Sequence, residues 1–296
     1  MRKRLVIHIG MHKTGSSAIQ HFLSRNRLAL RACGVLYPAS IGADGRRQPK
    51  HNALFTAISH EADHGAAHPM LGPSRALVEQ LRERIERTGA NMAIISAEGF
   101  SGEKPDFAAA LAPLGEAFDV KVLVFLRRPD EWLTSFHRQM IMSREIRETR
   151  ALPAFAEASS TRLHMDYPRI LSWWAEVFGG TAMTIARYDA EDPDLVGRFL
   201  TLARAPKALR LVRVSRARRN LSAPIEATLA RLAENRGEGR SARTEELFLT
   251  LDEKVELMNR LKDDWSSSMV SLSAYLDTPP FISLMLDEME AEIGTR

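Results

Sequence analysis

One segment governs the expected architecture, and it reads Leu5-Val-Ile-His-Ile-Gly-Met-His-Lys-Thr-Gly-Ser-Ser17. Its first five residues form a short apolar run rich in β-branched side chains, which predicts a buried strand. Gly10 and Gly15 then predict a tight loop, and the apolar spacing over 15–31 predicts a helix. A glycine-containing loop between a strand and a helix points backbone N–H groups and the positive helix end at one spot. The segment therefore predicts an α/β fold with a site for a phosphate-like anion.

Strands and helices alternate beyond this segment. Apolar runs predict strands at 92–95, 120–126 and 182–186. Helical spacing predicts helices at 76–87, from Pro129 onward, at 167–178 and at 194–202. Alternation of this kind predicts a parallel sheet with helices on both faces. Two stretches, 34–72 and 143–165, show little periodicity and are expected to be long functional loops.

From Ser222 onward the sequence predicts helices only. We therefore expect a single domain over 1–296 with a P-loop-like, three-layer α/β core at 1–214. Its central sheet should be mostly parallel, and a helical C-terminal extension should occupy 215–296. The apolar faces of that extension would serve as a cap, a homodimer contact, or both.

Composition and charge narrow the classes of function. The chain of 296 residues has 41 Lys and Arg against 37 Asp and Glu, a net charge of +4. That mild charge suits an anionic small molecule and does not indicate a nucleic-acid partner. Cys33 is the only cysteine, which favours a reducing compartment. The apolar run Leu5–Ile9 is too short for a signal peptide or an integral membrane segment, so a soluble, cytoplasmic protein is expected.

The loop departs from that of nucleotide triphosphatases in the place of its lysine. Gly10 and Gly15 have P-loop spacing and Ser17 stands where the Ser/Thr would, but Ser16 precedes it and the lysine is Lys13. Triphosphatases also need an acidic residue at a neighbouring strand end to hold magnesium. Here the strand at 120–126 is followed by two arginines. No metal site is expected, and the nearby histidines at 8 and 12 are interpreted as structural or loop-orienting.

Two motifs carry a family resemblance. Lys13-Thr-Gly-Ser-Ser17 resembles the 5′-phosphosulfate loop of sulfotransferases that use 3′-phosphoadenosine 5′-phosphosulfate (PAPS). The family also has an arginine at a strand end and a serine eight residues later, which together hold the 3′-phosphate of the donor. Arg127 and Ser135 have that spacing, and Pro129 falls where the family usually has proline. An arginine fork is well suited to bidentate contacts with phosphate.

Further segments extend the resemblance to bacterial sulfotransferase-family proteins over residues 4–203. They are Ile95-Ser-Ala-Glu-Gly-Phe100, Asp166-Tyr167, Trp173-Trp174 and Ile185-Ala-Arg-Tyr188. The resemblance implies transfer of a sulfuryl group from PAPS to a hydroxyl or amine, with adenosine 3′,5′-bisphosphate as the product. It also implies an in-line displacement without a metal. The acceptor stays open between a carbohydrate, a lipid-linked glycan, a phenol and a small metabolite.

The resemblance also implies roles for particular residues. The donor-binding set is His12, Lys13, Thr14, Gly15, Ser16, Ser17, Arg127 and Ser135. Lys13 would act catalytically on charge that develops on the leaving group. The general base is open between His51, whose type has an ordinary pKa near 6.5, and Glu98, which would need a raised pKa. The structural alternatives are a helix start for His51 and an arginine partner for Glu98.

Two other functions compete with sulfotransferase activity as interpretations of the sequence. A P-loop small-molecule kinase would bind ATP with magnesium, and the displaced lysine counts against it. A non-catalytic nucleotide- or nucleic-acid-binding protein would use aromatic platforms or helices that read bases, which the sequence lacks.

A basic cluster late in the sequence either closes over the 3′-phosphate of the donor or forms a solvated loop. It comprises Arg210, Arg213, Arg216, Arg218 and Arg219.

Overall fold

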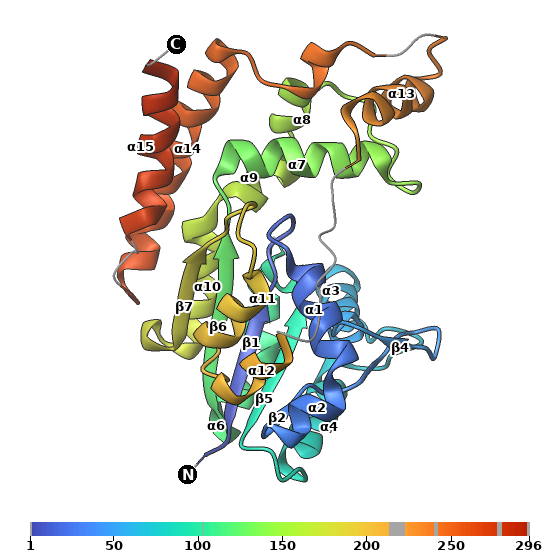
Figure 1. Ribbon diagram of the computed structural model, residues 1–296, viewed down its shortest axis with the longest axis vertical. Helices are drawn as coiled ribbons and strands as arrows, with labels where there is room; N and C mark the ends of the chain where they lie inside the picture. Colours follow the sequence, from blue (N-terminus) through green and yellow to red (C-terminus); the bar gives the residue numbers. More distant parts are fainter. Residues whose placement is uncertain (1, 103, 213–222, 240–241, 277–279, 295–296) are drawn as a thin grey trace. The chain divides into compact units, whose positions relative to one another are not determined.

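The computed structural model in Figure 1 describes residues 2–102, 104–212, 223–239, 242–276 and 280–294. The chain forms two compact units. The first comprises Met1–Leu126 with Ile170–Arg219, and the second comprises Arg127–Arg169 with Asn220–Arg296. Residues 127–169, which the sequence interpretation placed in the α/β core, thus group with the C-terminal helices. The expectation of a single domain with its boundary near residue 214 stays a prediction.

The first unit is built on a five-stranded sheet in the order β2-β5-β1-β6-β7 (Figure 1). Its strands are β1 (Arg4–Ile9), β2 (Val35–Leu36), β5 (Met92–Ala97), β6 (Asp119–Leu126) and β7 (Met183–Arg187). Every neighbouring pair in this sheet runs parallel. A separate antiparallel ribbon joins β3 (Ser40–Ile41) to β4 (Arg47–Gln48). The predicted α/β class with a mostly parallel central sheet is confirmed.

Helices surround this sheet. They are α1 (Ser16–Arg25), α2 (Arg27–Ala32), α3 (Asn52–His64), α4 (Ser74–Glu86), α5 (Asp106–Leu111), α6 (Pro113–Ala117), α10 (Tyr167–Phe178), α11 (Leu195–Leu202) and α12 (Leu209–Val212). Short 3-10 turns are η1 (Glu98–Ser101), η2 (Gly180–Ala182) and η3 (Pro206–Ala208). Because both faces of a parallel sheet are covered in such folds, its strands read as continuous apolar runs.

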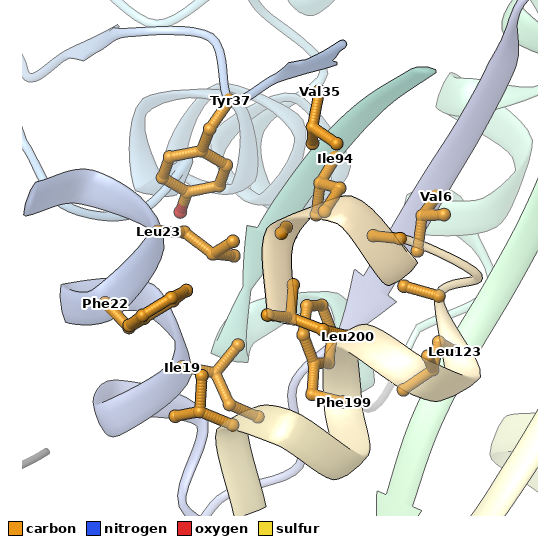
Figure 2. Packing of buried hydrophobic residues seen from close by; sticks show 14 of the residues in the cluster. Val6, Ile19, Phe22, Leu23, Val35, Tyr37, Ile94, Leu123, Phe199 and Leu200 are labelled. Carbon is orange, nitrogen blue, oxygen red and sulfur yellow. The ribbon is translucent and has the colours of Figure 1, made fainter. Parts of the chain in front are cut away.

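The packing on one face of the sheet shows why α1 and α11 form where they do. Figure 2 shows side chains of β1, β5 and β6 meeting an apolar stripe of α1 and another of α11. The labelled members from these elements are Val6, Ile94, Leu123, Ile19, Phe22, Leu23, Phe199 and Leu200, and Val35 and Tyr37 are labelled beside them. Successive strand side chains point to opposite faces, so Leu5, Ile7 and Ile9 point away from this cluster. They are also fully buried, so the second face of the sheet is covered as well.

The stretch 34–72 differs from its prediction as a long loop, because it contains β2, the ribbon and α3. Ala53, Leu54, Ala57 and Ile58 are the buried side chains of α3, and their spacing is that of one helix face. Two of the four are alanines, so the apolar signal of this face is weak against the surrounding histidines and acids.

Two other segments also differ from the sequence expectation. The stretch 143–165 contains α8 (Leu152–Ala156) and α9 (Ser159–Met165). The helix expected over 15–31 is divided into α1 and α2 at Asn26. The Asn26 side-chain Nδ2 donates to the Phe22 carbonyl oxygen at 2.8 Å, and this contact ends α1.

The second unit consists of helices over its described residues. Besides α8 and α9 it contains α7 (Pro129–Met142), α13 (Ile225–Arg236), η4 (Thr244–Leu247), α14 (Leu251–Ser273) and α15 (Pro280–Gly294). The predicted helical character of the C-terminal residues is confirmed. α14 begins with a capping box: Thr250 Oγ1 accepts from Glu253 N, and Glu253 Oε2 accepts from Thr250 N at 2.7 Å. None of the described helices is both long enough and apolar enough to cross a bilayer.

Candidate functional site

The site is built where β1 and β5 end side by side. Their register pairs Ile9 with Ala97, and Gly10 N donates to the Ala97 carbonyl oxygen at 3.0 Å. The loop 10–15 follows β1, and Glu98 follows β5. Ligands of open α/β sheets bind outside the carboxyl ends of the strands, which is this edge.

Two residues of the loop have left-handed backbone conformations. Gly15, the N-cap of α1, has φ 73°, and a Cβ there would lie 2.2 Å from Leu195 Cδ2. The dihedral angle therefore favours glycine, and any larger residue would also have to displace the Leu195 side chain. Lys13 has φ 62°, which is uncommon for a residue with a Cβ and costs about 1–3 kcal/mol. Such a cost at a loop lysine is typical of a residue held for function.

Hydroxyl groups hold the loop in shape from within. The Met11 carbonyl oxygen accepts from Thr14 Oγ1 at 2.8 Å and from Ser16 Oγ at 3.2 Å. All three residues are buried. Because each hydroxyl has a single proton to donate, those of Thr14 and Ser16 are already used. What these two residues can offer an anion is the backbone N–H, and the first N–H groups of a helix have no partner within it.

A carboxylate lies against the start of α1. Ser17 Oγ donates to Glu98 Oε1 at 2.9 Å, and Lys50 Nζ lies 3.5 Å from Glu98 Oε2. Ser101 Oγ donates to the Gly10 carbonyl oxygen at 3.2 Å, so the turn η1 is tied to the loop. The Glu98 side chain is 19% exposed. The structure thus places Glu98 beside the loop, with a lysine where the sequence considered an arginine.

His51 is placed differently from Glu98. It stands at the N-cap position of α3 with 4% of its surface exposed, and its side chain does not cap the helix. Its Nδ1 accepts from Ser96 N at 3.1 Å, and its ring lies edge-on to Tyr37 at 5.0 Å between centroids. Burial lowers the pKa of His51 to about 4. A catalytic role for His51 stays a prediction, and this burial counts against it.

A buried polar network behind the loop was not predicted from the sequence. Ser96 Oγ lies 2.8 Å from His8 Nδ1 and accepts from Gln20 Nε2 at 3.0 Å. Burial lowers the pKa of His8 to about 4, against an attraction to Glu98 that raises it. The network joins β1, β5 and α1, and its only sequence signal is a polar residue at each of three otherwise apolar positions. The structural reading of His8 is consistent with this placement.

These two buried histidines predict acid sensitivity of the fold. Their pKa values fall from 6.5 to about 4 on folding, so the unfolded chain takes up the protons first as the pH drops. The free energy of unfolding should therefore fall between pH 6.5 and about 4, by up to roughly 3 kcal/mol for each histidine. Urea unfolding across this range measures the slope.

The double variant His8→Gln, His51→Gln should flatten that slope, whatever its stability at pH 7. The exposed His21 supplies the control, since His21→Gln should leave the slope unchanged. An unaltered slope in the double variant would contradict the assignment.

Arg127 and Ser135 lie in the second unit, Arg127 two residues before α7 begins at Pro129 and Ser135 within that helix. Arg127 Nε donates to Glu131 Oε2 at 3.1 Å, and the Arg127 carbonyl oxygen accepts from Tyr167 Oη at 2.7 Å. Residues four apart on a helix share a face, so Glu131 and Ser135 lie on one face. Arg127 thus contacts the α7 face that carries Ser135 through Glu131, a residue that was not singled out from the sequence.

The remaining predicted residues are only partly described. His12 and Lys13 are half-buried in the loop, and Arg210 is exposed at α12. The rest of the basic cluster lies outside the described residues, as does Asn220–Ser222. Across the described ranges, no three His, Cys, Asp or Glu side chains are grouped so that they could hold a metal ion.

Comparisons with known proteins find a likeness among solved structures but no matching family model or curated protein. No protein-family model matches the chain, and no curated protein matches it significantly. Among solved structures, a sulfotransferase from Alicyclobacillus acidocaldarius is similar with 16% identity and a TM-score of 0.45, over 93% of this chain and 95% of that one. At this identity and TM-score, the likeness has no bearing on what this chain does.

Proposed function

We propose that this chain is a PAPS-dependent sulfotransferase that transfers a sulfuryl group to a hydroxyl or amine. The observation that carries the proposal is the loop between β1 and α1, with its left-handed Lys13 and Gly15 and the Glu98 carboxylate beside it. Cationic lysine and first-turn N–H groups suit the phosphosulfate end of the donor. The residues of this loop are those that resemble the family motif.

The proposed chemistry is a single in-line displacement at sulfur. The acceptor oxygen or nitrogen forms a bond to sulfur while the bond from sulfur to the bridging oxygen breaks. The electron pair of that bond stays on the bridging oxygen, which leaves as part of adenosine 3′,5′-bisphosphate. Lys13 and the N–H groups of Ser16 and Ser17 neutralise this charge as it develops.

Glu98 is the proposed general base. Its carboxylate takes the proton that the acceptor loses when it attacks sulfur. Ser17 and Lys50 each contact one of its oxygens, which fixes the carboxylate beside the start of α1. Partial exposure leaves it accessible, whereas His51 is buried. These observations favour Glu98 over His51 for the role.

The 3′-phosphate of the donor is assigned to Arg127 and Ser135. This assignment rests on the family spacing, with Arg127 just before α7 and Ser135 within it. A guanidinium gives charge-assisted contacts to phosphate, and a serine hydroxyl adds one more. A cytoplasmic location, a homodimer and a carbohydrate or small-molecule acceptor stay expectations alongside it.

Calorimetric binding of adenosine 3′,5′-bisphosphate, compared with ATP plus magnesium, tests the proposed function. Tight binding of the bisphosphate that EDTA does not change is the expected result. A preference for ATP with magnesium would overturn the proposal and favour the kinase alternative.

Arg127→Ala should weaken binding of the bisphosphate by about 10- to 100-fold, since it removes charge-assisted hydrogen bonds. Affinity for adenosine 5′-monophosphate, which lacks the 3′-phosphate, should change little. Calorimetry with both nucleotides gives the comparison. Equal losses for the two would mean that Arg127 does not read the 3′-phosphate.

A further inference from the structure

The two arginines just before α7 both lie near Glu131, but Arg128 has closer acidic partners of its own. Arg127 pairs with Glu131, whose side chain is 42% exposed. Arg128 is held by Asp130, through Nε to Oδ1 at 2.7 Å and Nη2 to Oδ2 at 2.9 Å. The Asp130 side chain is only 8% exposed. A buried, doubly bonded partner fixes Arg128 more firmly than the exposed glutamate fixes its neighbour.

A second carboxylate reaches Arg128 from the C-terminal helix. Glu292 of α15 accepts from Arg128 Nη2 through Oε2 at 2.8 Å. Its other oxygen, Oε1, accepts from Lys254 Nζ of α14 at 3.1 Å. Lys254 and then Arg128 lower the pKa of Glu292, which keeps it ionised at neutral pH. One carboxylate therefore connects both C-terminal helices to the first residue before α7.

The ion pair that Glu292 makes with Lys254 differs from the other ion pair between α14 and α15. α14 and α15 share a second ion pair, Lys262 Nζ to Glu290 Oε2 at 2.8 Å, which is more exposed. In the part of the chain that the structure describes, no ion pair joins Lys262 or Glu290 to α7. The pair α14 and α15 would thus hold together through either contact, and of these two ion pairs it is the one with Glu292 that extends to Arg128.

We propose that Glu292 is a positioning residue for the 3′-phosphate site, through which α14 and α15 hold Arg128 and so the backbone that presents Arg127. This inference rests on the proposed function and deepens it, because it gives the C-terminal helices a part in donor binding. Asp130 and Glu292 hold Arg128 in place, and the donor phosphate would be read by its neighbour Arg127. Glu131, a half-exposed partner of Arg127, is the group beside which that phosphate would bind.

The test uses the full chain and three substitutions. Glu292→Ala should weaken binding of adenosine 3′,5′-bisphosphate by about tenfold and leave binding of adenosine 5′-monophosphate nearly unchanged. Glu290→Ala is the matched control: it removes an ion pair between the same helices and should leave both affinities unchanged. Lys254→Gln frees Glu292 from α14 and should give a smaller loss in the same direction.

The possible outcomes distinguish a failure of the positioning role of Glu292 from a failure of the proposed function. Equal bisphosphate affinities in Glu292→Ala and Glu290→Ala, or parallel losses for both nucleotides, would overturn the positioning role. A gain in bisphosphate affinity in Glu292→Ala would also overturn it, since Arg128 would then be a phosphate ligand that Glu292 withholds. If wild-type protein shows no preference for the bisphosphate over the monophosphate, it is the proposed function that fails. Should Glu292→Ala not fold, Lys254→Gln measured against Glu290→Ala decides the question.

Discussion

Lys13→Ala is expected to lower turnover by about 100- to 1,000-fold while affinity for adenosine 3′,5′-bisphosphate falls much less. The ammonium group of Lys13 acts most strongly on the charge that appears on the bridging oxygen as the bond to sulfur breaks. An interaction that strengthens in the transition state appears in the rate rather than in ground-state binding. Steady-state turnover with PAPS, with calorimetry of the product on the same preparation, measures both quantities.

The left-handed backbone at Lys13 calls for a second substitution, because alanine keeps the strain of φ 62° while removing the charge. Asparagine tolerates this conformation better and is also neutral. Lys13→Asn should therefore be as slow as Lys13→Ala, and Lys13→Arg should recover part of the rate. A fast Lys13→Asn enzyme would show that loop shape matters and that the charge does not.

Glu98→Gln is expected to have an effect of comparable or larger size, with turnover lower by about 100- to 10,000-fold. The amide keeps the shape of the side chain and an oxygen for Ser17 Oγ, but it cannot take a proton from the acceptor at neutral pH. Binding of the bisphosphate should stay close to wild type, since the donor end of the site is intact. Single-turnover rates with saturating donor give the chemical step directly.

Two controls make the Glu98 result interpretable. Lys50→Gln removes the other contact of the carboxylate and should cost far less than Glu98→Gln. His51→Gln should mainly change stability, because that ring is buried against Ser96. If His51→Gln stays folded and loses turnover as severely as Glu98→Gln does, the general base is His51 and the present assignment is wrong.

The sheet could be predicted from sequence because β1, β5 and β6 are buried on both faces. Such strands appear as continuous apolar runs, so local pattern and tertiary environment agree. The anion loop was equally visible, since Gly10 and Gly15 mark a turn between a strand and a helix. The weakest local signal was that of α3, where half of the buried face is alanine.

The environment of the site residues could not be predicted, because it depends on contacts between distant parts of the chain. His51 and Ser96 are far apart in sequence, and their hydrogen bonds put a candidate base into the interior. Glu98 became the better candidate only through its contacts with Ser17 and Lys50. Glu292 contacts Arg128 from the other end of the chain, and no local pattern indicates that pair.

The place of β1 in the sheet has a consequence for how the protein is made. β1 precedes β5 and β6 in the sequence, yet it lies between them in the sheet, pairing Arg4 with Met92 on one side and with Asp119 on the other. Contacts of such long sequence separation form slowly, and a growing chain leaves the edges of β1 open until both neighbours have emerged. Unpaired strand edges are prone to association with other chains. The anion loop, which directly follows β1, therefore gains its contacts with Glu98 and Ser101 only after β5 and η1 have been synthesised.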